Sequence, residues 1–67
     1  MAVTTCLKQI RHENGINQEE LAFAIGAHPK SIGRIERGER NPSLEIALRL
    51  SQYLNRSVEE IFQIDEK

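Results

Sequence analysis

The chain has 67 residues and a formal net charge of −1. This length allows one domain with a marginal core, so an enzyme with a deep buried pocket is not expected, whereas dimerisation or close helix packing would add stability. Because the net charge is slightly negative, attraction to nucleic acid must come from local clusters of basic residues. Such a cluster lies in residues 28–41, while residues 59–67 are acidic. We therefore expect a single domain over residues 1–67, with its core in residues 5–62.

Residues that build metal or redox sites are scarce in this sequence. Cys6 is the only cysteine, which excludes an intramolecular disulfide and a cysteine-based zinc site and favours a half-buried apolar role for this residue. His12 and His28 have no companion ligands, so we expect neither a metal site nor a cofactor. The sequence shows no signal-peptide pattern and no apolar run of membrane length, and we expect a soluble, cytoplasmic protein.

The first part of the chain predicts two short helices. In residues 5–13 apolar residues recur at helical spacing, and Asn14 followed by glycine is typical of a helix end. Asn17, with Glu20 three positions later, matches a capping box, so a second helix begins there and ends at Gly26. The predicted inner face of this helix consists of Leu21, Ala22 and Ile25, and the apolar Phe23 on its outer face is expected to be partly packed.

A third helix is predicted over residues 29–37. Pro29 is tolerated as the first residue of a helix and forces the preceding residue out of the helical region. Ile32 and Ile35 give the helix an apolar stripe, and Gly38 closes it. Only three residues, one of them glycine, separate the second and third helices, which is the signature of a helix-turn-helix.

The last part of the chain predicts two more helices. The sequence Asn-Pro-Ser at residues 41–43 begins a fourth helix, and Ser57, with Glu60 at the capping-box position, begins a short fifth one that ends near Phe62. The core face predicted for the fourth helix consists of Leu44, Ala47, Leu48, Ser51 and Leu54. Residues 1–5 and 62–65 are short β-tolerant runs, which either pair as a two-stranded ribbon beside the helices or form frayed termini.

These pieces, in order and spacing, resemble a known family. The segments LKQIR, NQEELA, SIGRIERGER, NPSLEIALRLSQYL and VEEIF are similar to the Cro/Xre-type helix-turn-helix domain of phage repressors and small bacterial transcription regulators. The resemblance covers residues 7–62. It implies an all-α, compact five-helix bundle of the lambda repressor type, usually dimeric, whose third helix enters the major groove of double-stranded DNA.

The residues of the third helix agree with a role in reading bases. Side chains near the N-terminus of a recognition helix reach the base edges, and here these are Pro29, Lys30, Ser31 and, one turn later, Arg34. Lys30 and Arg34 are four residues apart and project from one face of the helix. Both residue types donate to guanine O6 and N7, so we expect half-sites that contain guanine. On their own they would be read as solvated cations, but the surrounding motif favours base contact.

Further residues are expected at the DNA backbone. Gln18 lies at the first turn of the second helix, where its amide and the free backbone N–H groups can hold a phosphate oxygen; the alternative is a simple helix-start residue. The other phosphate contacts expected from the resemblance and from charge are Arg11, Arg37, Arg40, Asn41 and His28. For His28 a plain turn residue is the favoured alternative. Glu39 departs from the family pattern, and we expect it to lower the contribution of Arg40.

The resemblance also bears on residues inside the domain. It implies an ion pair between Arg11 and Glu36 that orients the first and third helices. Gly33 inside the third helix costs helix stability. Either the missing side chain lets the helix sit closer to the bases or the position is uncritical.

The predicted function is that of a dimeric repressor that reads a palindromic operator. Apolar residues near the fifth helix suit a two-fold interface; they are Tyr53, Val58, Ile61, Phe62 and Ile64. The acidic end of the chain should then point away from DNA. The alternative is an antitoxin-like protein-interaction module with secondary DNA binding, which the low charge and Phe23 favour. Catalysis is not expected, because no nucleophile is paired with a base.

Overall fold

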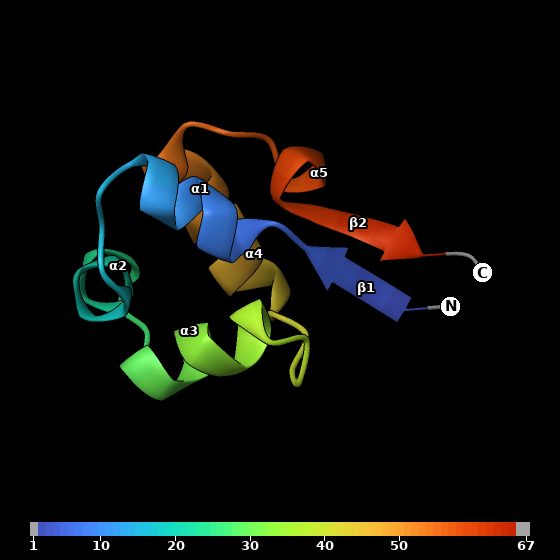
Figure 1. Ribbon diagram of the computed structural model, residues 1–67, viewed down its shortest axis with the longest axis horizontal. Coiled ribbons are helices and arrows are strands. Elements are labelled where there is room, and N and C mark those ends of the chain that lie inside the picture. The colour runs from blue at the N-terminus through green and yellow to red at the C-terminus, as the bar shows by residue number, and fades with distance from the viewer. Residues whose placement is uncertain (1, 66–67) are drawn as a thin grey trace.

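The computed structural model describes residues 2–65, which form five helices and two short strands (Figure 1). In chain order the elements are β1 (Ala2–Thr5), α1 (Leu7–Glu13), α2 (Gln18–Ile25), α3 (Pro29–Glu36), α4 (Leu44–Leu54), α5 (Val58–Ile61) and β2 (Phe62–Asp65). The helices surround one core, while the two strands project together from one end of the molecule, on the right of Figure 1. The protein is thus a small helical domain with a two-stranded antiparallel sheet.

The strands settle the alternatives left open for the two ends of the chain. β1 and β2 pair in antiparallel fashion, with Ala2 opposite Asp65 and Thr5 opposite Phe62, so the ribbon is the correct alternative. Because Thr5 belongs to the strand, α1 begins two residues later than predicted. The Thr5 hydroxyl joins β1 to α5 and α1, since it donates to the Ile61 carbonyl at 2.9 Å and accepts from the Leu7 N–H at 3.1 Å. Met1, Glu66 and Lys67, which belong to the predicted ribbon and acidic end, lie outside the described residues.

The predicted starts of α2, α4 and α5 are confirmed by their hydrogen bonds. The Asn17 side chain accepts from the Glu20 N–H at 2.7 Å, and the Glu20 carboxylate accepts from the Asn17 N–H at 3.0 Å. Ser57 and Glu60 form the same reciprocal pair at the start of α5. The Ser43 hydroxyl accepts from the third N–H of α4 at 3.1 Å. These bonds satisfy backbone donors that the first turn of a helix leaves free.

The predicted core face of α4 is partly wrong. Leu44 and Leu48 are 75% and 49% exposed, whereas Leu50, which the prediction omitted, is fully buried. The stripe that faces the core consists of Ala47, Leu50 and Leu54. Both sets of residues have helical spacing, and the choice between them depends on where α2 and α5 lie against α4.

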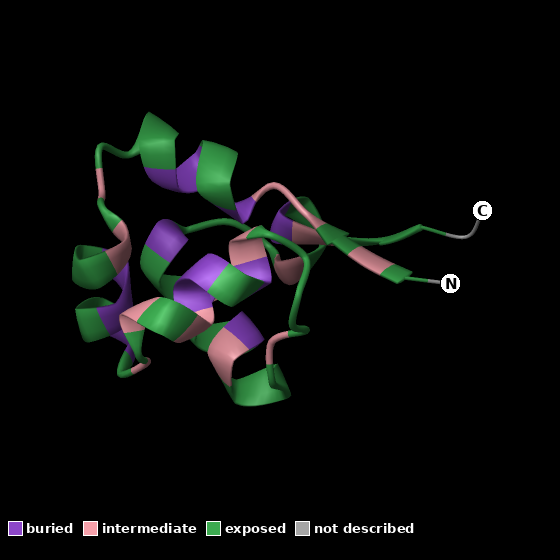
Figure 2. Cartoon of the chain, turned by 60° about the horizontal axis from the view of Figure 1, so that its bottom comes forward, coloured by how far each residue is buried: buried purple, intermediate pink, exposed green. Residues whose placement is uncertain are grey.

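The core takes residues from every helix (Figure 2). Its members are Leu7, Ile10, Leu21, Ala22, Ile25, Ile32, Ile35, Leu50, Leu54 and Ile61. Ile61 is completely buried, so its predicted place at a subunit interface is wrong: the side chain is used inside the monomer. Cys6 is half-buried against this core, as predicted, and its thiol donates to the Glu60 carbonyl at 2.9 Å. Phe23, expected to be partly packed, is 91% exposed because it lies opposite the buried face of α2.

Candidate nucleic-acid interface

The turn between α2 and α3 positions the start of α3. Gly26 ends α2 with a left-handed backbone (φ 72°), which a glycine adopts without strain. His28 is extended, and Pro29 follows as the first residue of α3. The Nδ1 atom of His28 accepts from the Lys30 N–H at 3.2 Å. His28 is therefore a helix cap rather than a plain turn residue.

The outer face of α3 carries the predicted base-contacting residues. Lys30 and Arg34 are exposed, and Pro29 and Ser31 are half-buried, while Ile32 and Ile35 are buried on the opposite side. Within residues 2–65, neither Lys30 nor Arg34 forms an ion pair. The helix thus presents two cations, one turn apart, that are paired with no carboxylate of residues 2–65.

A buried ion pair joins α1 to the end of α3, as the resemblance implied. Arg11 Nε lies 2.6 Å from Glu36 Oε2, and Arg11 Nη2 donates to Glu36 Oε1 at 3.2 Å. Only 8% of the Arg11 side chain and 2% of the Glu36 side chain are exposed. Gln18 Nε2 donates to the same Glu36 Oε1 at 3.0 Å, and Arg11 Nη1 donates to the Ile16 carbonyl. The pair therefore ties α1, α2 and α3 together.

The electrostatics of Glu36 reflect two opposed effects. Burial raises the pKa of this carboxyl, but the hydrogen bonds from Arg11 and Gln18 and the Arg11 charge lower it by more, so the pKa lies below its ordinary value. Arg11 was also predicted to contact a phosphate. Because its guanidinium is buried and its Nε, Nη1 and Nη2 atoms already donate to Glu36 or Ile16, Arg11 is not part of the proposed interface.

Gly33 lies beneath two of the predicted phosphate-contacting side chains. A Cβ atom at this position would be 3.1 Å from Arg37 Nη1 and 3.6 and 3.7 Å from Gln18 Nε2 and Oε1. The glycine is buried by these neighbours. The structure thus gives Gly33 a role that neither sequence-based alternative included, because it leaves room for the Arg37 and Gln18 side chains to lie over α3.

The loop after α3 pairs Glu39 with Arg37. Its carboxylate accepts from Arg37 Nε at 2.9 Å and from Arg37 Nη2 at 3.2 Å. These bonds lower the pKa of Glu39 and raise that of Arg37. Glu39 is therefore paired with Arg37, while its expected effect on the contribution of Arg40 to DNA binding stays a prediction. In the described part of the chain, Arg40 forms no ion pair.

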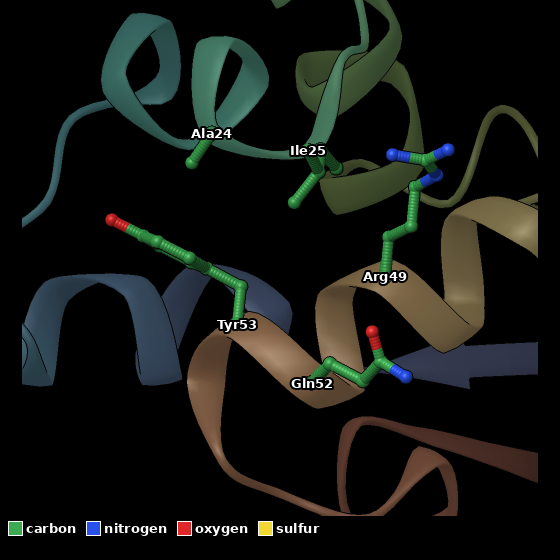
Figure 3. A pocket seen from close by; sticks show the side chains of 5 residues that line it. All are labelled: Ala24, Ile25, Arg49, Gln52 and Tyr53. Carbon is green, nitrogen blue, oxygen red and sulfur yellow. The ribbon is translucent and has the colours of Figure 1, made fainter.

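Two hollows flank these elements. One, of about 160 Å³, lies beside α3, and its polar lining residues are His28, Ser31, Arg40, Asn41 and Ser43. The other, of about 270 Å³, lies between α2 and α4, where the Tyr53 ring extends toward Ala24 (Figure 3). Tyr53 thus faces α2, whereas Val58, Phe62 and Ile64 belong to α5 and β2. None of the helices in residues 2–65 has the length and hydropathy needed to cross a membrane.

Known proteins resemble this chain in sequence and structure. A family model described as Helix-turn-helix matches residues 7–61. An uncharacterized HTH-type transcriptional regulator of Archaeoglobus fulgidus is 36% identical over 63 residues, covering 94% of this chain and 89% of that protein. The restriction-modification controller protein C.AhdI from Aeromonas hydrophila is 39% identical, with a TM-score of 0.75 and coverage of 81% of this chain and 82% of that chain.

A third relative is SinR from Bacillus subtilis, described as the master regulator for biofilm formation. Its structure in complex with DNA is 35% identical, with a TM-score of 0.73 and coverage of 79% of this chain and 86% of that chain. SinR has also been solved in complex with the SinI protein.

Proposed function

Because the chain belongs to the helix-turn-helix family of transcriptional regulators, we propose that it is a repressor that binds double-stranded operator DNA with α3 in the major groove. The observation that carries this proposal is the outer face of α3, where Lys30 and Arg34 are exposed and form no ion pair within the described chain. The structure of the relative SinR in complex with DNA supports it.

We assign the contacts in two groups. Base edges are contacted by Pro29, Lys30, Ser31 and Arg34, and phosphates by Gln18, His28, Arg37, Arg40 and Asn41. The first group lies in the first turns of α3, and the second lies at the start of α2, at the cap of α3 and in the loop after α3. Only the first group selects sequence, because phosphate contacts set register and affinity without distinguishing bases.

The active form that we propose is a homodimer joined through α5 and β2. Val3 and Ile64 lie opposite each other in the ribbon, as do Thr5 and Phe62, so these four side chains share one face. Ile64 is 55% exposed, and with Val58 and Phe62 it forms the proposed interface. Tyr53 is omitted because its ring faces α2. Two α3 helices about 34–36 Å apart would read half-sites one helical turn apart.

Selection of purified protein against a random duplex library at roughly 0.15 M salt tests this function. We expect enrichment of a palindrome whose half-site centres lie about 10 bp apart. Enrichment of a single half-site without symmetry would contradict the dimer. The absence of any enriched sequence would contradict operator reading.

A protein-interaction module is the second candidate function, and the exposure of Phe23 favours it. The complex of the relative SinR with SinI shows that a member of this family binds a protein. The salt dependence of DNA binding separates the two candidates, because each neutralised phosphate contributes about −0.9 to the slope of log K against log salt. A steep slope supports the regulator, and a flat profile supports the interaction module.

A further inference from the structure

The side chains of Gln18 and Arg37 converge on one point of the α3 surface. Arg37 Nη1 and both terminal atoms of the Gln18 amide lie within 3.7 Å of the position that a Gly33 Cβ would occupy. Gln18 comes from the first turn of α2 and Arg37 from the end of α3. Glu36 holds the Gln18 amide through the 3.0 Å bond to Nε2. An amide nitrogen carries two hydrogens, so one N–H of Gln18 Nε2 is left for a ligand.

Glu39 holds the Arg37 guanidinium through two nitrogens other than Nη1. It accepts hydrogen bonds from Nε and Nη2, which leaves the two N–H groups of Nη1, the nitrogen that lies with the Gln18 amide near the Gly33 Cβ position. The backbone at Glu39 is itself fixed, because its N–H donates to the Arg34 carbonyl at 2.9 Å after Gly38 turns the chain at φ 75°. The residue that carries this carboxylate is thus hydrogen-bonded through its backbone to the last turn of α3.

We propose that Glu39 is a positioning residue, which holds Arg37 over Gly33 so that Arg37 Nη1 and Gln18 Nε2 bind the same DNA phosphate. This inference rests on the proposed function, since it explains how two of the residues proposed to contact phosphate are held in position. It reverses the effect expected of Glu39 from the sequence, where a carboxylate beside DNA should only weaken binding.

Two opposed physical effects decide whether Glu39 strengthens or weakens DNA binding. A long arginine side chain loses rotamer freedom when it binds a phosphate, and an arginine already held in place loses less. The two-point geometry from Nε and Nη2 to one carboxylate fixes the guanidinium plane as well as its position. Against this stands the repulsion between Glu39 and the phosphate. The repulsion is weakened because the guanidinium carries the opposite charge beside the carboxylate and because physiological salt screens exposed charges beyond about 8 Å.

A double-mutant cycle on Glu39 and Arg37 tests the proposal. The full chain, Glu39→Ala, Arg37→Ala and the double variant are titrated with a short fluorescent duplex of arbitrary sequence at about 50 mM to 200 mM salt. An arbitrary duplex suffices because phosphate contacts are independent of sequence. We expect Glu39→Ala to weaken binding roughly two- to fivefold in the natural chain, the range set by exposed ion pairs. In the Arg37→Ala background, where only the repulsion remains, the same substitution should tighten binding.

Matched variants separate positioning from charge. Glu39→Gln keeps one acceptor oxygen for Arg37, so its affinity should lie between those of the natural chain and Glu39→Ala. Glu45→Ala removes an exposed carboxylate that pairs with Arg49 on α4, and the effect of this substitution on DNA binding should not depend on Arg37. Thermal unfolding of each variant checks that the fold is retained.

The outcomes distinguish the two levels of inference. If Glu39→Ala tightens binding equally in both backgrounds, Glu39 is only a repulsive charge and the positioning role is wrong, while DNA binding stands. Equal weakening in both backgrounds would also overturn the role, because it would not act through Arg37. If the natural chain binds no duplex even at low salt, the proposed function fails and the positioning role fails with it.

Discussion

Arg34 and Gln18 belong to different groups of contacts, so their substitution should have different signatures. Arg34 lies on the outer face of α3, whereas Gln18 lies at the start of α2. We predict that Arg34→Ala relaxes the preference at one base position of each half-site by about 1–3 kcal/mol, while Gln18→Ala weakens all duplexes alike. Competition titrations with single-base variants of the selected operator measure this. An equal loss on specific and random DNA for Arg34→Ala would rule out the base contact.

The buried pair between Arg11 and Glu36 should make Glu36 the most sensitive carboxylate in the described chain. Removal of one partner leaves the other charge buried without compensation, so we predict that Glu36→Ala costs about 3–5 kcal/mol of unfolding free energy. That cost is comparable to the whole stability of a small domain. Glu45→Ala, at an exposed pair, should cost less than about 1 kcal/mol. Urea unfolding compares the two, and similar losses would contradict the importance of burial.

The lowered pKa of Glu36 also predicts how stability depends on pH. Because the folded pKa lies below the unfolded value of about 4.3, the unfolded chain binds the proton first as the pH falls. The stabilisation is therefore complete above the unfolded pKa and is lost as the pH falls through the folded pKa. Glu36→Gln should flatten this part of the stability curve, measured by urea midpoints across the acid range. Parallel curves for the variant and the natural chain would show that other carboxylates dominate.

At the scale of elements, α4 offers a matched pair of leucines. Leu50 is completely buried and Leu48 is 49% exposed, only two positions away on the same helix. We predict that Leu50→Ala costs about 2–5 kcal/mol, because it leaves a cavity in the core. Leu48→Ala should change the stability by less than about 1 kcal/mol. The unfolding midpoints of the two variants check the register of α4, and a larger loss for Leu48 would reverse it.

How much could be predicted from the sequence depends on how far apart along the chain the interacting residues lie. Asn17 with Glu20 and Ser57 with Glu60 are three residues apart, so their capping boxes were predicted and are confirmed. The face of α4 was mispredicted because two apolar stripes fit one helix, and only its neighbours select between them. The ribbon stayed an open alternative because its strands lie at opposite ends of the described chain.

In the candidate site, too, some features could be predicted from the sequence and others could not. Lys30 and Arg34 could be assigned to one face of α3 from their spacing alone, and the pair between Arg11 and Glu36 followed from the resemblance. The partner of Glu39 could not be predicted, because whether it pairs with Arg37 or leaves it free depends on side-chain rotamers. The assignment of DNA contacts stays a prediction.

At the scale of the whole molecule, the proposed dimer predicts that a substitution can abolish dimerisation without unfolding the monomer. Ile64 is 55% exposed in the monomer, so Ile64→Lys should leave the fold intact while placing a charge in the proposed interface. We predict a shift from dimer to monomer in sedimentation equilibrium and a loss of preference for palindromes over single half-sites. Thr4→Lys, on the other face of the ribbon, is the control. A variant at Ile64 that stays dimeric would place the interface elsewhere.

The pairing of β1 with β2 links subunit association to the folding order of the chain. The free-energy cost of closing a loop of n residues, which is entropic, grows as (3/2)RT ln n. Local helical contacts also form faster than contacts between distant segments. We therefore expect the ribbon to be the last element to form and the first to open. Because Phe62 and Ile64 of the proposed interface lie on β2, association through this interface would stabilise the closed ribbon, and the closed ribbon would stabilise association. We therefore expect the protection of the ribbon amides against hydrogen exchange to rise with protein concentration, whereas protection in the helical core should not.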